Sequence, residues 1–587
     1  MTLNSKLSRS NSETDSVGLA FVFEPSNFDT TGQMLVGRQA ASEAFLKAIV
    51  QHGSQRTLSA VTPLPDSAQA FADRIAEWSH QTMSSTWIRP HDLTMANTVE
   101  TLFRPGPDLA PLAWTRGHTN TNAFSLCGIT HTTADHFALD AIAALAAGPL
   151  EPWDALVCTS DAVKTMVQTH MDDWQNYYFD KFGSGGTPKR TPSPALPVIP
   201  LGVDCNSFAD TAATTAARKD IRAQLSASDD DVVVLYLGRL SHSDKANPLP
   251  LFVALEATAQ RMSKKLHLVL AGWFPLKQTE DGFREAALAW APSVKTTFID
   301  GRDSNIRQYI RFAADIFASF PDNIQETFGL TPLEAMAAGL PIVASDWDGY
   351  RATVRDGIDG FLVPTWMPDP LAGVEISQWF QSGTINYDAF AAAAAQSVAV
   401  DIATATEAFV RLANDPALRK TMGEAGRTAA RQSFDWPLII KAYEDLWAAL
   451  REERLSAVGH SMTHPSLPRP NPFTLFAGYP THQISEETRL TQGSLDLIRA
   501  LTTQSLSAAI ARPLPNFLMA DTEVSCLLEV LKTPQTVKNM IRLLEPTDLG
   551  RFHRTLTWLI KVGALIEDID RTPMASHLLE TDDEKES

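Results

Sequence analysis

The segment that decides the fold reads Glu326-Thr-Phe-Gly-Leu-Thr-Pro-Leu-Glu334-Ala-Met-Ala-Ala-Gly-Leu-Pro-Ile-Val-Ala-Ser345. Thr331 is a favourable N-cap and proline suits the first helical position, so a helix is expected over Pro332–Ala338. Gly339 is the kind of residue that ends a helix, and the apolar run Pro341–Ser345 predicts a buried strand. A short helix that leads into a buried strand is typical of an α/β domain.

The same alternation extends back toward residue 231. The expected strands are Val232–Leu237, Leu266–Ala271, Lys295–Asp300 and Ile316–Phe320, and the expected helices are Leu249–Met262, Gly282–Ala291 and Ile306–Ala314. Strict alternation predicts a parallel, doubly wound sheet. A second series has expected strands at Val17–Phe23, Ala123–Thr130 and Ala155–Cys158. We therefore expect an α/β fold with two Rossmann-like domains whose parallel sheets face a cleft.

The remaining boundaries follow from changes in composition. The expected parts are a polar leader (1–15), an N-terminal Rossmann-like domain (16–210), a C-terminal Rossmann-like domain (211–434), a closing helix (435–455), a Pro- and Ser-rich linker (456–483) and a small helical domain (484–587). In the last part, the expected helices Glu523–Lys532, Gln535–Leu544 and Leu549–Val562 precede an extended Ala564–Glu567. This order resembles a winged-helix module.

Charge and cysteine content exclude several classes of protein. The chain has 587 residues and a formal charge of -19, which disfavours generic binding to nucleic acid or to an anionic membrane. Residues 521–587 hold 13 Asp or Glu against 8 Lys or Arg, so a DNA-binding role of the last domain is disfavoured as well. The four cysteines lack CxxC spacing, which predicts neither a zinc site nor a disulfide framework. With no apolar leader visible, we expect a cytoplasmic protein.

The decisive segment also predicts a site. The backbone N–H groups of Phe328, Gly329 and Leu330 precede the expected helix, where the positive end of the helix dipole favours an anion such as a diphosphate. Glu326 stands just before them, placed to accept hydrogen bonds from hydroxyl groups. Glu334 also has a purely structural interpretation, because Thr331-x-x-Glu334 is the pattern of a capping box.

Three blocks of sequence carry a resemblance to a known family. The segment with Glu326 and Glu334 resembles the E-x7-E signature of the retaining family 4 glycosyltransferases (glycosyl transferases group 1), which have the GT-B fold. Leu235-Tyr-Leu-Gly-Arg239-Leu, with Lys245 six residues further on, is similar to the block whose basic residues contact the donor phosphates. Ile199-Pro-Leu-Gly-Val-Asp204 is similar to the lead into the second domain. The resemblance covers about residues 16–452 and is strongest from about 155 to 365.

The resemblance implies roles for these residues. Arg239 and Lys245 would bind the donor diphosphate and stabilise the charge that grows on it as the sugar leaves. Glu326 would hold the sugar hydroxyls, Glu334 would hold the ribose, and Gly238 would line the donor site. Such enzymes usually need no metal, because the two cations replace it, so we expect neither metal nor cofactor.

The N-terminal half contributes fewer candidates. His131, in Gly128-Ile-Thr-His131-Thr, resembles the histidine that faces the donor sugar. Family members often carry two adjacent glycines after the first strand, whereas this chain has single glycines, Gly32 and Gly37, followed by Arg38. Gly32 is the candidate for contact with the donor phosphates. Asp229-Asp-Asp231 is interpreted as a solvated turn rather than a metal-binding motif.

The resulting hypothesis is a retaining glycosyltransferase that moves a sugar from a UDP- or GDP-type donor to an acceptor hydroxyl, in glycan or polysaccharide biosynthesis. The acceptor would be a glycan, a lipid-linked saccharide or a protein, reached by transient membrane association at most. One alternative is a nucleotide-sugar epimerase or a sugar phosphorylase on the same fold. Another is a non-catalytic scaffold that senses a nucleotide sugar and acts through its C-terminal domain, for which a protein partner or dimerisation is expected.

Overall fold

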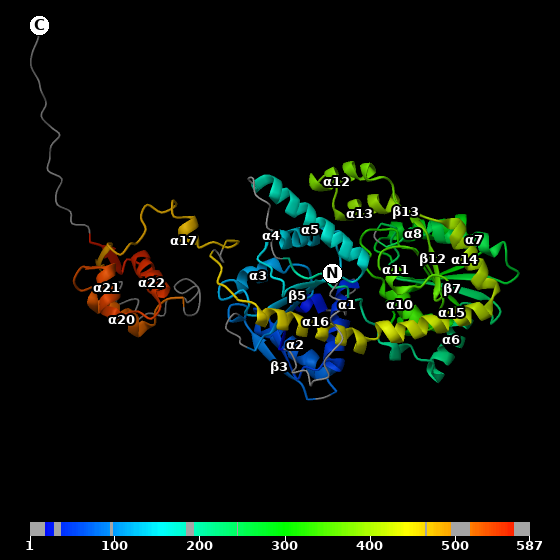
Figure 1. Cartoon of the computed structure of the whole chain (residues 1–587), viewed down its shortest axis with the longest axis horizontal. Helices are drawn as coiled ribbons and strands as arrows, with labels where there is room; N and C mark the ends of the chain where they lie inside the picture. Colours follow the sequence, from blue (N-terminus) through cyan, green and yellow to red (C-terminus); the bar gives the residue numbers. More distant parts are fainter. Residues whose placement is uncertain are drawn as a thin grey trace, which may run out of the picture. The chain divides into compact units, whose positions relative to one another are not determined.

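The computed structural model describes residues 18–28, 37–80, 82–93, 98–183, 193–243, 245–463, 467–494 and 517–568 (Figure 1). The chain divides into two compact units, Met1–Pro468 and Arg469–Ser587. The division falls inside the predicted linker. The first unit holds two parallel sheets, and the second holds a small antiparallel sheet with its own helices.

The N-terminal sheet is parallel, in the order β3-β2-β1-β4-β5-β6. Its strands are β1 (Leu19–Val22), β2 (Thr57–Val61), β3 (Ser84–Ile88), β4 (Thr101–Arg104), β5 (Ser125–Ile129) and β6 (Ala155–Val157). The helices around it are α1 (Gly37–His52), α2 (Pro65–Trp78), α3 (Ala110–Arg116), α4 (His136–Ala147) and α5 (Asp161–Phe182), with the 3-10 turn η2 (Pro25–Phe28). The strand order reverses beside β1, so the sheet is doubly wound, as predicted.

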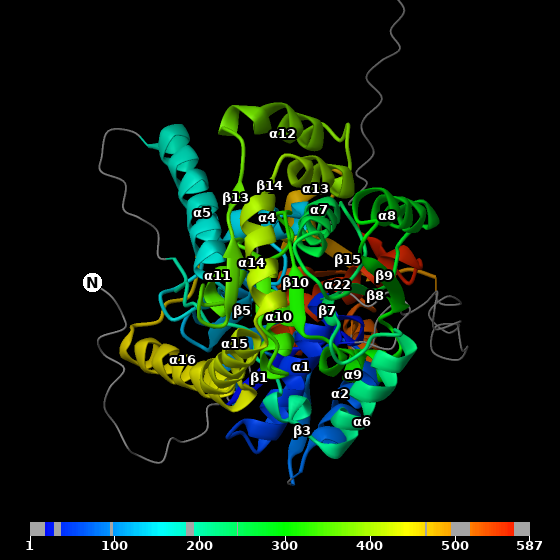
Figure 2. The ribbon, with the colours of Figure 1, turned by 90° about the vertical axis from the view of Figure 1, so that its right-hand side faces the viewer.

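The C-terminal sheet repeats this topology, in the order β12-β11-β10-β7-β8-β9 (Figure 2). Its strands are β7 (Val232–Leu237), β8 (Leu266–Gly272), β9 (Lys295–Asp300), β10 (Ile316–Ser319), β11 (Ile342–Ser345) and β12 (Gly360–Val363). Its helices are α6 (Ala212–Gln224), α7 (Leu249–Ala259), α8 (Lys277–Trp290), α9 (Ser304–Ala313), α10 (Leu330–Ala337), α11 (Tyr350–Thr353), α14 (Ile402–Asn414) and α15 (Pro416–Ala429).

Strand β7 is buried on both faces. Val233 and Leu235 pack in the core that contains residues of α9 and α10. Val232 and Val234 pack in the core that contains residues of α7, α8 and α14. Burial on both faces explains why the strand is a continuous apolar run without polar alternation.

An insertion follows β12. Strands β13 (Thr365–Trp366) and β14 (Ala399–Val400) pair antiparallel, and between them lie η5 (Pro370–Gly373), α12 (Val374–Gln381) and α13 (Tyr387–Gln396). The alanine-rich window Phe390–Val400 predicted a buried helix here, which overlaps α13, whereas α12 and the strand pair were not predicted.

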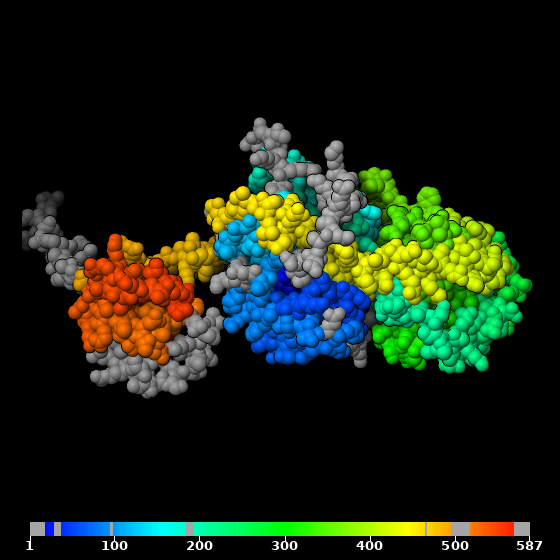
Figure 3. All heavy atoms as spheres, turned by 60° about the horizontal axis from the view of Figure 1, so that its bottom comes forward, coloured from blue at the N-terminus to red at the C-terminus, as the bar shows by residue number. Residues whose placement is uncertain are grey.

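The two sheets are joined by two crossings of the chain. The first crossing contains η4 (Cys205–Phe208), and the second contains the π-helical turn η6 (Ala430–Phe434) that precedes α16 (Trp436–Ser456). The N–H of Val203 donates to the carbonyl of Phe434 at 2.9 Å, and the N–H of Trp436 donates to the carbonyl of Val203 at 3.2 Å. Helix α16 then packs on α1 and β5, so the end of this unit returns to the N-terminal half (Figure 3).

Most predicted strands of the C-terminal sheet agree with the structure to within about a residue, but two helix starts were wrong. Helix α8 begins at Lys277, before the predicted Gly282. Helix α10 begins at Leu330 with Gly329 as its N-cap, so Thr331 is not the cap. The physical reason is the backbone of Gly329, whose φ of 87° turns the chain into the helix two residues early. Gly339, with φ of 84°, follows the helix end as expected.

The second unit has its own apolar core. Its elements are α17 (Pro472–Leu475), β15 (Arg489–Gln492), α20 (Asp521–Val530), β16 (Gln535–Thr536), α21 (Val537–Leu544), α22 (Leu549–Lys561) and β17 (Leu565–Glu567). The fully buried core side chains include Leu527, Met540, Phe552 and Leu559. The sequence analysis expected helices here, and β15 is a correction, because it forms the central strand of the β16-β15-β17 sheet. The winged-helix assignment stays a prediction.

Across the part of the chain that the structure describes, no helix has the length and hydrophobicity of a membrane span.

Candidate functional site

The site predicted from sequence lies where the C-terminal sheet reverses its strand order. β7 and β10 are neighbours, yet the chain continues from β7 toward β8 on one side and from β10 toward β11 on the other. The loops after β7 and β10 therefore diverge beyond the carboxyl ends of these strands, and this is where doubly wound sheets usually bind ligands. Arg239 and Lys245 follow β7, and Glu326 and α10 follow β10.

The turn after β7 places Arg239. Gly238 has a φ of 153°, and its N–H donates to the carbonyl of Ala271 at 3.0 Å. The Tyr236 hydroxyl donates to the carbonyl of Arg239 at 3.1 Å, and the Arg239 guanidinium lies 5.9 Å from the centre of the Trp273 ring. These contacts hold a cation at the carboxyl edge of the sheet.

Lys245 and Glu326 form an ion pair between the loops after β7 and β10. The Lys245 Nζ donates to Glu326 Oε2 at 3.0 Å, with the lysine side chain one-third exposed and the glutamate 13% exposed. Partial burial lowers the local dielectric, so the pair interacts more strongly than one in open solvent. The structure thus brings together the basic residue and the first acid of the predicted motif.

The start of α10 lies next to this pair. Among the described residues no side chain caps α10. Phe328 is buried and contributes its ring to the core, so only its backbone can serve the predicted anion site. A Cβ on Gly329 would lie 1.9 Å from the Tyr350 ring, which leaves glycine as the residue that fits.

Glu334 does not form the capping box. Its Oε2 accepts from Arg311 Nη2 of α9. Arg311 is buried, donates from Nη1 to the carbonyl of Arg307 at 2.7 Å, and stacks 5.2 Å from the centre of the Phe208 ring. The capping box, in which Glu334 would accept from the N–H of Thr331, was therefore wrong. Helix α10 starts before Thr331, so Thr331 is not at the cap position, and Glu334 pairs with Arg311. The sequence analysis missed Arg311.

His131 lies at the edge of the N-terminal half that meets this site. The Thr327 hydroxyl donates to the carbonyl of His131 at 2.7 Å, and the Thr159 hydroxyl donates to the carbonyl of Thr327 at 3.3 Å. Burial, and secondarily the charge of Arg38, lowers the pKa of His131 to about 4. Its imidazole is therefore neutral near pH 7, which suits hydrogen bonding rather than ion pairing.

The part of the chain that carries this site is similar to known proteins. Residues 217–395 match the family described as Glycosyl transferases group 1. These residues are a glycosyl transferases group 1 domain. Together with the N-terminal doubly wound sheet, the domain gives the two Rossmann-like domains expected from the sequence.

Two curated relatives share this part. The phosphatidyl-myo-inositol mannosyltransferase of Mycobacterium tuberculosis is 35% identical over 173 residues, which cover 29% of this chain and 40% of that protein. The D-inositol 3-phosphate glycosyltransferase of Geodermatophilus obscurus is 34% identical over 191 residues, covering 30% of this chain and 38% of that protein. The chain thus matches about two-fifths of the length of these relatives.

Among solved structures, this chain is similar to Anabaena HepE in complex with UDP. The aligned part covers 73% of this chain and 99% of that chain, with 16% sequence identity and a TM-score of 0.46.

Two carboxyl groups of the group 1 domain were missed by the sequence analysis. Burial raises the pKa of Asp322, in the loop after β10, to about 7. Burial also raises the pKa of Asp348, after β11, to about 7, and the Ser160 hydroxyl donates to its Oδ1 at 2.8 Å across the two halves of the unit. Neither residue belongs to an apolar run, so the hydrophobic pattern carried no signal for them, although Asp348 stands in a turn with Gly349.

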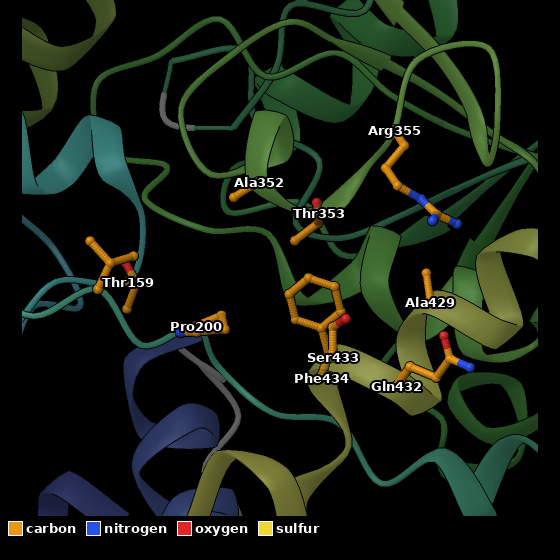
Figure 4. A pocket seen from close by; sticks show the side chains of 10 residues that line it. Thr159, Pro200, Ala352, Thr353, Arg355, Ala429, Gln432, Ser433 and Phe434 are labelled. Atoms are coloured by element: carbon orange, nitrogen blue, oxygen red, sulfur yellow. The ribbon is translucent and has the colours of Figure 1, made fainter. Parts of the chain in front are cut away.

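A cavity of about 350 Å³ lies at the crossings between the two halves (Figure 4). Its lining comes from Thr159, from the first crossing at Pro200, from the segment after β11 at Thr353, and from η6 at Phe434. None of its lining residues is a predicted donor-site residue. It adjoins the group 1 site through Thr159, whose hydroxyl holds the carbonyl of Thr327.

Three further expectations concern Gly32, a metal ion and the segment Asp229–Asp231. Gly32 lies outside the described residues. No group of three His, Cys, Asp or Glu side chains placed to hold a metal ion occurs in the described ranges. Asp229 and Asp230 are exposed turn residues, as expected, while the partly buried Asp231 carboxylate lies 3.4 Å from the buried His267 and accepts from the N–H of Ser228 at 2.7 Å.

Proposed function

We propose that this protein is a retaining glycosyltransferase that moves a sugar from a nucleotide-sugar donor to an acceptor hydroxyl. The observation that carries the proposal is the Lys245–Glu326 ion pair, which joins the loop that also carries Arg239 to the loop that leads into α10, at the switch point of the group 1 domain. Cations, an anion-binding helix end and a hydroxyl acceptor at this switch point match the three parts of a nucleotide sugar.

In this proposal the donor diphosphate lies against Arg239, Lys245 and the backbone N–H groups of Gly329 and Leu330. The bond between the anomeric carbon and the diphosphate oxygen breaks, and both cations stabilise the charge left on that oxygen. The acceptor oxygen bonds to the same face of the anomeric carbon, and its proton passes to the departing phosphate. Because the two cations supply the stabilisation, no metal ion or cofactor is proposed.

The carboxylates have separate proposed tasks. Glu326 accepts hydrogen bonds from the donor sugar, and Glu334, held by Arg311, accepts from the ribose. The neutral His131 faces the donor sugar from the N-terminal half. Closure of the two halves around the donor would exclude water from the reacting atoms.

The acceptor side rests on the relatives alone. We propose an acceptor hydroxyl on a glycan, on a lipid-linked saccharide or on a protein, as part of glycan biosynthesis in the cytoplasm. The named activities of the relatives, on inositol-containing acceptors, belong to those proteins. For the second unit we propose docking to a protein partner or to a second copy.

Thermal-shift binding to UDP-, GDP- and ADP-sugars tests the proposal. We expect one nucleotide class to stabilise the wild type, and Arg239→Ala and Glu326→Ala to remove most of that stabilisation. Arg284→Ala is a matched control, because Arg284 also lies over an aromatic ring, 4.6 Å from the centre of Phe298, but belongs to α8. It should respond as the wild type does.

The transfer step needs a second readout. Incubation with the stabilising donor and candidate acceptors should give a glycosylated product with the anomeric configuration of the donor. Isomerised donor instead of product would favour the epimerase, and phosphorolysis the phosphorylase. Binding without turnover would favour the scaffold. No stabilisation by any donor would refute the proposal.

A further inference from the structure

Asn323 is a fully buried amide in the loop between β10 and Glu326, with none of its surface exposed to solvent. Its side chain makes three hydrogen bonds to backbone groups. Nδ2 donates to the carbonyl of Lys245 at 2.5 Å, while Oδ1 accepts from the N–H of Gln325 at 2.9 Å and from the N–H of Glu326 at 3.3 Å. One side chain therefore contacts the backbone of both members of the Lys245–Glu326 ion pair.

The orientation of the amide follows from these partners. The Oδ1 side faces two N–H groups and the Nδ2 side faces a carbonyl, so the reversed amide would place donors against donors. The side chain uses donor and acceptor at once, which neither aspartate nor leucine of similar size can do. Asparagine thus fits this position for a specific reason.

Neighbouring contacts hold Asn323 itself in place. The Trp347 Nε1 donates to the carbonyl of Asn323 at 2.9 Å, which links its backbone to the loop after β11. The carboxylate of Asp322 accepts from the N–H of Asn247 at 3.1 Å, so two consecutive side chains bind the loop that carries Lys245. The loops after β7, β10 and β11 are connected through this one short segment.

We propose that Asn323 is a positioning residue of the donor site, which sets the separation of Lys245 and Glu326 for the donor diphosphate and sugar. The proposal rests on the proposed function. The two loops leave neighbouring strands in different directions, and an ion pair between two long side chains fixes the separation of their backbones only loosely. A buried bridge between the two backbones fixes that separation before the donor arrives, and small displacements of such groups cost large factors in rate.

A double-mutant cycle tests the proposal. Asn323→Ala should lower kcat/KM for the donor about 10- to 100-fold. In a Lys245→Ala background, the same change should cost no more than about a third of that factor, because the group that it positions is absent. Equal factors in the two backgrounds would overturn the proposal.

Ser345→Ala is the control for a merely structural loss. The Ser345 hydroxyl is also buried and donates to the carbonyl of Pro321 at 2.7 Å, in the same loop, without contacting Lys245 or Glu326. It should lower the thermal midpoint to an extent similar to Asn323→Ala, with kcat and KM near those of the wild type. If Asn323→Ala does not fold, Asn323→Asp replaces it, since a carboxylate keeps the Oδ1 acceptor and loses the Nδ2 donor.

The outcome separates this inference from the proposed function. Donor turnover in the wild type, with Asn323→Ala indistinguishable from Ser345→Ala, would refute the role of Asn323 alone. A wild type that binds no nucleotide sugar would refute the proposed function. In that case the double-mutant cycle is measured by the thermal midpoint of unfolding. If Asn323→Ala and Lys245→Ala lower the midpoint additively, the positioning role of Asn323 is refuted as well.

Discussion

Asp348 shows how a single partly buried residue connects the two halves of the first unit. Its carboxylate accepts from the Ser160 hydroxyl, which also caps α5 by accepting from the N–H of Val163 at 3.1 Å. Its backbone has a φ of 40°, a conformation that favours asparagine over most residues. Burial, the nearby charge of Glu326 and the opposing effect of Arg351 leave its pKa at about 7.

The raised pKa predicts a pH-dependent stability. The folded state holds the proton of Asp348 more tightly than the unfolded chain, where an aspartate titrates near about pH 4. As the pH rises from about 4 to about 7, the unfolded chain ionises first and the free energy of unfolding falls. Asp348→Asn removes this loss and keeps an acceptor for Ser160.

The thermal midpoint of Asp348→Asn should therefore exceed that of the wild type by about 3 °C or more above pH 7, with the smallest difference near pH 4. A series of melting curves across this range measures it. A difference that does not change with pH would contradict the assigned pKa.

At the scale of elements, the β10–α10 connection decides the site. Gly329 caps α10 with a left-handed backbone, and the missing Cβ admits the ring of Tyr350. The helix therefore starts early enough to expose its first N–H groups beside Glu326 and to release Glu334 toward Arg311.

Gly329→Ala should destabilise the first unit by about 2 kcal/mol or more and abolish donor binding, because the added Cβ requires both a strained φ and displacement of Tyr350. Gly282→Ala is the control, since its Cβ would meet nothing within 4 Å inside α8 and should stabilise by up to about 1 kcal/mol. Denaturant unfolding of both variants provides the comparison. Equal stabilities would contradict the role of Gly329.

The strands differ in how well the sequence predicted them, for a physical reason. β7 and β10 are buried on both faces, so their apolar runs are continuous and their bounds were predicted closely. β3, at the edge of the N-terminal sheet, has the sequence Ser-Ser-Thr-Trp-Ile and is mostly exposed, so no run marked it. In the insertion, α12 has no buried residue and was missed, whereas α13, with Ala391 and Ala395 buried, overlaps the predicted helix Phe390–Val400.

At the scale of the whole molecule, the chain closes its first unit with α16 and continues as a second unit from Arg469. The residues of the proposed donor site all belong to the first unit. The second unit has its own buried core around Leu527 and Phe552.

A chain that ends at Pro468 should therefore fold and keep its donor affinity within about twofold of the full-length protein. Calorimetry should show that one transition of the full-length chain is lost and that the transition stabilised by donor remains. Loss of donor binding on truncation would indicate that the second unit contributes to the site.

The local sequence is enough to predict the fold class, because apolar runs, helix ends and turn glycines indicate two doubly wound sheets. The spacing of the motifs indicates Arg239, Lys245, Glu326 and Glu334 as site residues. These are local properties, since each depends on residues within about ten positions of one another. Which side chains contact one another follows only from the tertiary structure. Lys245 meets Glu326 across 81 residues and Glu334 takes Arg311 instead of a cap, while Asn323 bridges two loops. Such pairings depend on strand order and on the exact helix start, which no local pattern encodes.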